Sequence, residues 1–264
     1  PAVLLDELGL GEDALEHLRQ RRHALAAGER EPGVADVFER RYGRRIGVVP
    51  YGVEDPGGEG TATLERLGLE PRRYLLFVGR LEPENNPHVL VEAFARIPAA
   101  QARGMKLVVV GHAPYASDYI RQVQRAGDPR VIFPGAIYGE GYWELQRHAY
   151  AFCAPTEVGG THPVILEALA AGNCVLVNDH APNVETVGDA GLTFSGEEGV
   201  PALARELERI LGEPELVEDY RGRARERARR YSWDAVTDQY ERLLQDACAA
   251  GRPGWLPPHL VSAR

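Results

Sequence analysis

The chain has 264 residues, 44% of them hydrophobic, which is enough to bury one large core or two small ones. Its formal net charge of -9 argues against the broad basic surface with which proteins hold nucleic acid or anionic lipid. The three cysteines, Cys153, Cys174 and Cys248, are widely spaced and form no Cys-x-x-Cys pair, which argues against a disulfide framework or a zinc site. We interpret Cys153 and Cys174, each inside an apolar run, as buried small hydrophobes.

No apolar run in the sequence reaches the roughly 18 residues that a membrane-spanning helix needs. The segment Pro1–Glu7 has neither the basic region nor the long apolar region of a secretory signal. We therefore expect a cytoplasmic location, and we leave open a peripheral attachment to the inner face of the membrane.

The first 45 residues differ from the rest of the chain. They are predicted to form one or two charged helices, Glu12–Ala27 and Val34–Arg41, in a helical arm or a remnant of another domain. From residue 46 onward, short apolar runs alternate with amphipathic stretches. Several runs are rich in Val, Ile and Leu without alternation, as expected for strands covered on both faces. These predicted strands are Ile46–Val49, Tyr74–Val78, Lys106–Val110, Val131–Phe133, Ala149–Ala154, Cys174–Val177 and Leu192–Phe194.

Helical patterns lie between the apolar runs. Pro87–Ile97 has an apolar stripe, and Pro163–Ala171 begins with proline at its first position and is followed by Gly172 as a stop signal. Charged helices are predicted at 202–212, 216–229 and 233–249, and an extended tail comes after them. Strands and helices that alternate at this spacing predict an α/β fold with a doubly wound, parallel, Rossmann-like sheet.

The first candidate loop, Val78–Pro87, follows a predicted strand. In open α/β sheets, ligands bind at the carboxyl ends of the strands. Gly79 allows a ligand to come close to the backbone, Arg80 supplies a permanent positive charge, and the next helix begins where the loop ends. These residues predict an anion site, although a plain turn with a solvated arginine explains them as well.

The second candidate loop contains Gly159–Thr161 just before the helix predicted at Pro163. Glycine amides and a threonine hydroxyl at a helix N-terminus predict a phosphate site. Glu157 ends the preceding strand and Glu167 lies a turn inside the helix. Acids repel phosphate, so we interpret them as acceptors for hydroxyl groups, one on a sugar and one on a ribose. The alternative is that Glu167 is a surface residue and that His162 stands at the helix start by chance.

The third candidate loop, within Val131–Gly139, follows another predicted strand. It is either an ordinary turn or a segment whose backbone contacts a nucleotide base near Ile137.

The order of these motifs resembles a known family. Val48–Val53 is similar to the "IPNGVD" segment that opens the C-terminal domain of family-4 glycosyltransferases of the GT-B fold. Residues 77–97 resemble the first phosphate-binding loop of that family, and residues 107–114, 130–179 and 183–194 come in the family's order. The resemblance covers about residues 46–236 and is specific because order and spacing agree together. It implies a nucleotide-sugar-binding domain at 46–236, after the arm at 1–45 and before a helix and tail at 237–264.

The resemblance also implies roles for individual residues. Arg80 would neutralise the donor diphosphate, Glu157 would contact the transferred sugar, and Glu167 would hold the ribose hydroxyls. The backbone near Ile137 would face the base. The implied catalytic residues are Arg80 and Glu157, and the implied donor-binding residues are Gly79, Arg80, Asn86, Ile137, Gly159, Gly160, Thr161, His162 and Glu167.

The sequence departs from the family in three ways. Asn85 and Asn86 stand where most members have a lysine shortly after the arginine, and nine residues rather than seven separate Glu157 from Glu167. Both features resemble a subgroup that includes rhamnosyltransferase-like enzymes. About 45 residues precede the matched region, too few for the N-terminal domain that binds the acceptor, so we expect a fragment or a partner chain.

The function that the resemblance implies is a retaining glycosyltransferase that uses neither a metal nor a cofactor. The sequence contains no Asp-x-Asp pair, which argues against the metal-dependent glycosyltransferase architecture. The expected partners are a UDP-, GDP- or dTDP-sugar and an acceptor that is a glycan, a lipid or a small molecule; nucleic acid is not expected. Two alternatives stay open, a non-catalytic nucleotide-sugar-binding module and a nucleotide-sugar epimerase.

Overall fold

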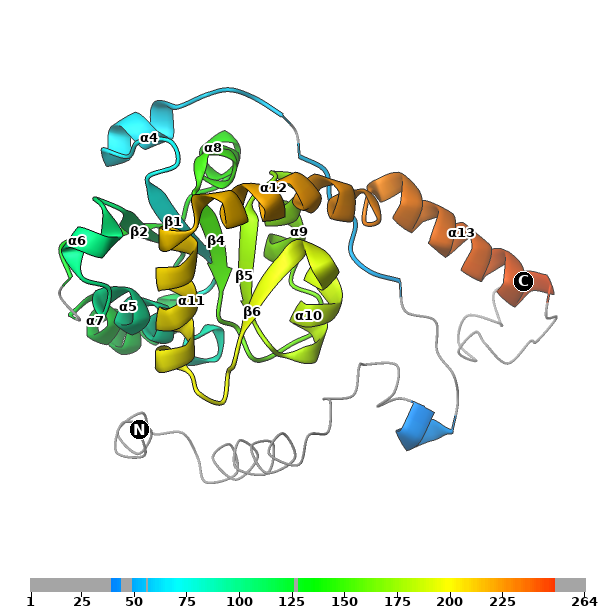
Figure 1. Cartoon of the computed structure of the whole chain (residues 1–264). Helices are drawn as coiled ribbons and strands as arrows, with labels where there is room; N and C mark the ends of the chain where they lie inside the picture. Colours follow the sequence, from blue (N-terminus) through cyan, green and yellow to red (C-terminus); the bar gives the residue numbers. More distant parts are fainter. Residues whose placement is uncertain (1–38, 44–48, 56, 126–127, 250–264) are drawn as a thin grey trace.

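A computed structural model describes residues 39–43, 49–55, 57–125 and 128–249. These residues form one parallel sheet in the order β3-β2-β1-β4-β5-β6, with helices on both faces (Figure 1). The arrangement confirms the predicted doubly wound, Rossmann-like fold. The strands are β1 (Tyr74–Val78), β2 (Lys106–Val110), β3 (Val131–Gly135), β4 (Ala151–Ala154), β5 (Cys174–Asn178) and β6 (Gly191–Phe194).

The sheet separates two hydrophobic cores, because successive side chains of a strand point to opposite faces. In β1, Leu75 and Phe77 belong to the first core, whereas Tyr74 and Leu76 belong to the second. All four are buried. This arrangement explains why the strands read as continuous apolar runs.

Each core is closed by its own set of helices. The first core takes its side chains mainly from α5 (Pro87–Ala95), α6 (Ala99–Ala102), α7 (Ser117–Gln124) and α11 (Val200–Gly212). The second takes them mainly from α4 (Ala62–Leu67), α8 (Glu140–His148), α9 (Pro163–Ala170), α10 (Ala181–Val187) and α12 (Pro214–Arg229). Short 3-10 turns, η1 (Pro83–Asn85), η2 (Pro114–Ala116) and η3 (Gly188–Ala190), lie in the connections. The helix α13 (Trp233–Ala249) runs outward beyond the sheet (Figure 1).

The observed limits of α9 confirm the prediction that this helix starts at Pro163 and is stopped by Gly172. The helix begins at Pro163, and Gly172 follows the cap residue Ala171 with a positive φ of 74°. The amide of Gly172 donates to the carbonyl of Leu169 at 3.0 Å, and that of Asn173 donates to the carbonyl of Ala168 at 2.9 Å. Glycine allows this left-handed turn, which satisfies carbonyls that the helix itself leaves unpaired.

The cysteines and the two ends of the chain were also the subject of predictions. Cys153 and Cys174 are buried and free, as predicted. Residues 39–42 are helical, but the rest of the predicted arm, most of the strand predicted at 46–49 and the tail beyond residue 249 lie outside the described residues. Within the described part of the chain, no helix has the length and apolarity needed to cross a bilayer.

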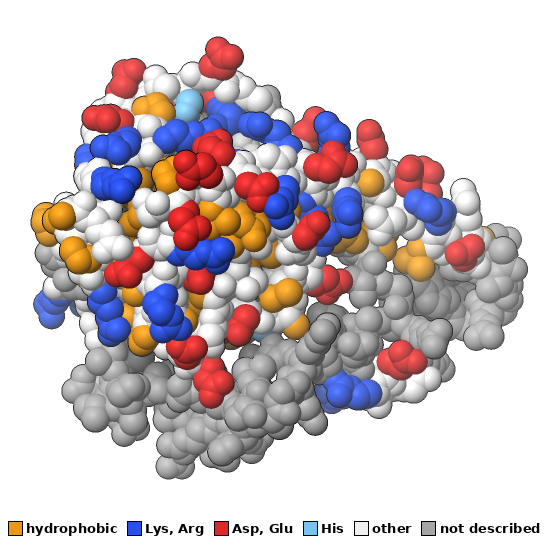
Figure 2. All heavy atoms as spheres, viewed as in Figure 1, with side chains coloured by type: hydrophobic (Ala, Val, Ile, Leu, Met, Phe, Trp, Pro, Cys, Tyr) orange, Lys and Arg blue, Asp and Glu red, His pale blue; other side chains and the backbone are white. Residues whose placement is uncertain are grey.

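Acidic and basic side chains are intermixed on the face of the molecule shown in Figure 2. Elsewhere in the described chain, ion pairs one helical turn apart occur on α12, where Arg223 pairs with Asp219 and Arg229 pairs with Glu226. Exposed pairs of this kind contribute little to stability, usually below about 1 kcal/mol.

Candidate functional site

The strand order places a topological switch point between β1 and β4. The connection after β1 runs through α5 into the first core, whereas the connection after β4 runs through α9 into the second. In doubly wound sheets, such a switch point at the carboxyl ends of the strands is where ligands bind. The bases of the two loops stay in contact, because Asn86 Nδ2 donates to the Pro155 carbonyl at 3.1 Å and the Glu157 amide lies 3.5 Å from the Glu84 carbonyl. The first two predicted loops thus form one site.

Three helices begin at this carboxyl edge without a hydrogen bond from the side chain of their cap residue. The cap residues are Asn86 for α5, His162 for α9 and His180 for α10. Backbone amides at a helix start carry partial positive charge, which favours an anion when no side chain neutralises it. The edge therefore suits phosphate groups, and Asn86 serves as a cap and a bridge between the loops.

Arg80 lies on the rim with its side chain 69% exposed, turned toward the loop after β2. Its Nη2 lies 2.9 Å from Glu82 Oε1, and its Nη1 donates to the Tyr115 hydroxyl at 3.2 Å. These two partners, Tyr115 first and Glu82 second, raise the pKa of Arg80 above its ordinary value. Asn85 donates to the Arg80 carbonyl at 2.9 Å. Arg80 is therefore the cation of this loop, and Asn85 holds the loop in shape.

The loop after β4 is supported from β5. Asn178, at the end of β5, lies with its Nδ2 3.4 Å from Glu157 Oε1 and accepts from the His180 amide at 2.8 Å. His180 Nε2 lies 3.1 Å from the Gly159 carbonyl, so the tautomer with its proton on Nε2 donates there. Glu157 and the Gly159–Thr161 segment are thus held in place by residues that lie about 20 positions further along the chain.

His162 folds back over the glycine segment. A Cβ placed on Gly159 would meet His162 Cε1 at 3.2 Å. Burial lowers the pKa of His162, and neighbouring His180 lowers it further, so the ring is neutral near pH 7. Its Nε2 is buried and has no hydrogen-bond partner among the described residues. Gly160 faces open space, in which a ligand could contact its backbone.

Glu167 lies inside α9, half-buried, and accepts a hydrogen bond from the Tyr142 hydroxyl through Oε2. Gln146 Nε2 donates to the same hydroxyl at 2.9 Å. Burial raises the pKa of Tyr142, and the charge of Glu167 raises it further, so Tyr142 stays protonated and donates. Half-buried Ile137 lies against the start of α8, where a Cβ on Gly141 would meet its Cγ2 at 3.3 Å. The third predicted loop thus adjoins α8, which also contacts Glu167.

Several residues of the site escaped the sequence analysis. Gly111 follows β2 with a positive φ of 148°, and a Cβ there would lie 1.8 Å from the Gly79 carbonyl oxygen. Only glycine fits this crossing, which sets the position of the loop that carries Arg80. Gly111 and Asn178 both stand at strand ends, so the rule that picked Gly79 and Glu157 would also have found them. Glu82, Tyr115 and Tyr142 carried no such signal.

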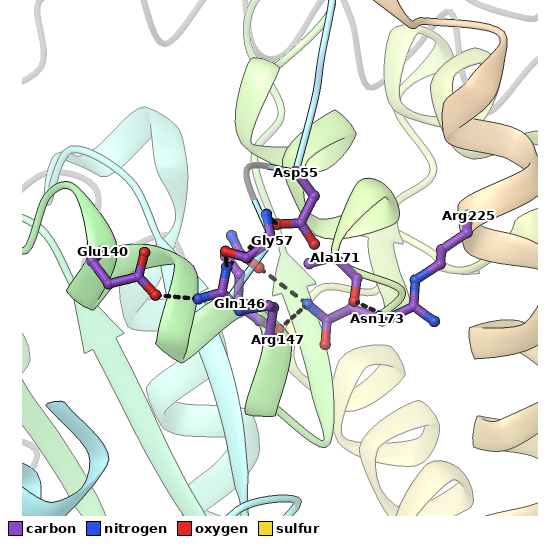
Figure 3. A network of polar contacts seen from close by, with 8 residues as sticks. All are labelled: Asp55, Gly57, Glu140, Gln146, Arg147, Ala171, Asn173 and Arg225. Atoms are coloured by element: carbon purple, nitrogen blue, oxygen red, sulfur yellow. Dashed lines mark hydrogen bonds and ion pairs between the residues drawn. The ribbon is translucent and has the colours of Figure 1, made fainter. Parts of the chain in front are cut away.

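The opposite edge of the sheet also gathers polar groups, but these bind the protein to itself (Figure 3). Arg147, 10% exposed, donates to the Gly57 carbonyl at 2.6 Å and pairs with Asp55 at 3.3 Å and with Glu140. Asn173 Nδ2 donates to the Gln146 carbonyl at 2.6 Å. These contacts fasten the segment before α4 and the start of β5 to α8.

The fold is a doubly wound α/β domain, and its switch point brings together the two predicted loops that carry Arg80, Glu157 and Glu167. Residues 63–227 match the model of the family described as glycosyl transferases group 1, so the chain belongs to that family. It is 31% identical over 210 residues to a phosphatidyl-myo-inositol mannosyltransferase of Mycolicibacterium smegmatis, covering 75% of this chain and 53% of that protein. It is 32% identical over 212 residues to a D-inositol 3-phosphate glycosyltransferase of Actinosynnema mirum, covering 74% and 50%. The chain thus spans about half the length of these relatives.

Solved structures share the fold. Sucrose-phosphate synthase of Thermosynechococcus elongatus superposes with a TM-score of 0.66 at 24% identity, over 81% of this chain and 56% of that one. HepE of Anabaena, solved in complex with UDP, superposes with a TM-score of 0.62 at 19% identity, over 70% and 52%. The GT-B type of fold expected for the domain is thereby confirmed.

Proposed function

We propose that this chain is the donor-binding part of a retaining, metal-independent glycosyltransferase that takes its sugar from a nucleotide diphosphate. The observation that carries the proposal is the set of residues at the switch point. It has Arg80 on the β1 side, and on the β4 side the uncapped start of α9 between Glu157 and Glu167. A site for phosphate alone would have no use for the two acids, whereas a nucleotide sugar has hydroxyl groups at both ends of its diphosphate.

The diphosphate is assigned to Arg80 and to the backbone amides of Gly159–Thr161 at the start of α9. When the bond between sugar and diphosphate breaks, negative charge grows on the leaving phosphate. Fixed donors stabilise such charge without having to reorganise. Arg80 gives a charge that does not depend on pH, and the helix start gives oriented dipoles. These groups would perform the task that a divalent metal performs in other enzymes.

The two acids are assigned to different ends of the donor. Tyr142 holds Oε2 of Glu167, and we assign Oε1 to a ribose hydroxyl. Asn178 orients Glu157, which we assign to the transferred sugar together with the buried Nε2 of His162. The backbone near Ile137, beside α8, is assigned to the base.

The identity of the base and of the transferred sugar is to be determined by experiment. Two of the similar proteins are mannosyltransferases, and the HepE structures contain UDP, UDP with glucose, or UDP-glucose. UDP-, GDP- and dTDP-sugars are therefore the compounds to compare. The acceptor is a glycan, a lipid or a small molecule. We assign its binding to a segment that corresponds to the half of the relatives that this chain does not match.

The test is a thermal-shift screen of the purified chain against UDP, GDP, dTDP and their sugars, with and without EDTA, followed by calorimetry on the hits. A ligand at 100 times its Kd raises the unfolding free energy by about 2.7 kcal/mol, so a true donor gives a clear shift. We expect one nucleotide family to bind, equally well with EDTA present. Failure of every nucleotide diphosphate to bind would contradict the proposal, and binding that EDTA abolishes would contradict metal independence.

A further inference from the structure

The contacts of Arg80 raise a question that its assigned role does not answer. Its guanidinium is already paired with a carboxylate, Glu82, whose side chain is only 9% exposed. A diphosphate that binds Arg80 must therefore compete with an acid that belongs to the same loop. Ion pairs of this kind oppose the binding of any anion that needs the same cation.

The surroundings of Glu82 are arranged so that Arg80 can leave. The Tyr115 hydroxyl donates to Glu82 Oε2 at 2.5 Å, and Asn85 Nδ2 lies 3.4 Å from Oε1. A buried carboxylate without donors would be strongly unfavourable, but these two neutral donors stay with Glu82 after the arginine has moved. The Arg80 side chain, 69% exposed, has room to turn toward a ligand, whereas that of Glu82, 9% exposed, has not.

We propose that Glu82 is an internal counterion of Arg80, and that the diphosphate of the donor displaces it from Arg80 on binding. This inference rests on the proposed function. An uncharged nucleoside has no charge with which to draw Arg80 away from Glu82, so its binding does not depend on this ion pair. A diphosphate has the charge to replace Glu82, while Tyr115 and Asn85 keep the vacated carboxylate hydrogen-bonded.

The proposal predicts an effect of unusual sign, because removal of a polar group from the site should tighten binding. Glu82→Gln keeps the shape of the side chain but releases Arg80. We expect it to bind inorganic pyrophosphate and UDP about three- to fivefold more tightly than the parent, the range for an ion pair with one exposed member. Glu82→Asp keeps the charge but shortens the reach to Arg80, so it should tighten pyrophosphate binding by a smaller factor. Uridine should bind all three proteins equally.

Two controls isolate the ion pair. Glu84, exposed in the same loop, makes no ion pair among the described residues, so Glu84→Gln removes one negative charge without releasing Arg80. We expect it to change pyrophosphate binding less than Glu82→Gln does. In an Arg80→Ala background, Glu82→Gln should have no further effect, because the cation that it releases is gone. Melting curves confirm that each variant is folded.

Calorimetric titrations of these variants with pyrophosphate, UDP and uridine decide the matter. Weaker or unchanged pyrophosphate binding by Glu82→Gln overturns the inference and leaves the proposed function standing, since Glu82 would then only position the arginine. An equal gain in Glu84→Gln, or a gain that persists without Arg80, also overturns it. If neither pyrophosphate nor any nucleotide diphosphate binds the parent chain, the proposed function itself fails.

Discussion

The two edges of the sheet use arginine in opposite ways. At the amino-terminal edge, Arg72 and Arg221 both donate to the carbonyl of Ala149, the residue that caps the C-terminus of α8, at 2.6 and 3.2 Å. Arg225 lies 3.4 Å from the carbonyl of Ala171, the corresponding residue of α9 (Figure 3). At the carboxyl-terminal edge, Arg80 is largely exposed and its loop adjoins uncapped helix starts.

We interpret the amino-terminal edge as one that stabilises the fold, and the carboxyl-terminal edge as the proposed binding edge. The carbonyls at helix C-termini attract cations, and at the amino-terminal edge the protein supplies these from its own side chains. The amides at helix N-termini attract anions, and at the carboxyl-terminal edge the cap residues supply none. The helix α9 has both conditions at once, because Arg225 lies at its C-terminal end and the cap residue at its start makes no side-chain hydrogen bond.

The largest expected effect is a loss of stability at the proposed binding edge, where Gly111 crosses the Gly79 carbonyl. Gly111→Ala would place a Cβ against the Gly79 carbonyl and strain the backbone, so we expect a loss of about 3 kcal/mol or more in unfolding free energy. Gly222→Ala, within α12 where nothing lies near the new Cβ, should instead stabilise by about 0.5–1 kcal/mol. Urea denaturation measures both, and a fully stable Gly111→Ala protein would contradict the close crossing of Gly111 and Gly79.

The next effect concerns the two acids at the binding edge. Glu167→Gln should weaken free nucleotide diphosphate and the full donor alike, by about 1.5–3 kcal/mol, because its partner is the ribose. Glu157→Gln should leave the free nucleotide nearly unaffected and weaken only the sugar-bearing donor, within the same range. Calorimetry with both ligands separates the two cases. Equal losses for the two ligands in Glu157→Gln would contradict our placement of the sugar.

The smallest expected effect is a pH dependence of stability. Burial lowers the pKa of His88, His148 and His162 in the folded protein. The unfolded chain therefore binds protons more readily than the folded one as pH falls below about 6.5, and stability is lost in that direction. His88→Asn removes the contribution of His88, whose Nδ1 lies 2.7 Å from the Tyr119 hydroxyl. Denaturation at pH 7.5 and 5.5 should show a smaller difference in this variant than in the parent; an equal difference would contradict the assignment.

Much of the fold could be predicted because the signals are local. The strand Tyr74–Val78 and the limits of α9 follow from apolar runs, a leading proline and a following glycine. The loops that carry Arg80 and Glu157 could be chosen because they follow strands, and parallel strands end at one edge of a sheet.

The partners of those residues could not be predicted in the same way. Tyr115 lies 35 residues from Arg80, and Tyr142 lies 25 residues from Glu167. Which loops meet depends on the strand order 3-2-1-4-5-6, and the alternation of strands and helices does not determine that order. The ion pair of Arg80 with nearby Glu82 was missed for another reason, because a charge in a loop gives no sign that its side chain is buried.

One measurement tests the contrast between the edges most directly. The parent, Arg80→Ala and Arg147→Ala proteins are titrated by calorimetry with UDP, GDP and dTDP, and their unfolding free energies are measured. We predict that Arg80→Ala keeps its stability and loses about 1.5–3 kcal/mol of binding free energy for the nucleotide that the parent prefers. Arg147→Ala should lose a similar amount of stability, because its guanidinium, 10% exposed, makes charge-assisted hydrogen bonds to the Gly57 carbonyl and to Asp55, and should bind that nucleotide as the parent does. Unchanged nucleotide binding in Arg80→Ala would contradict the account.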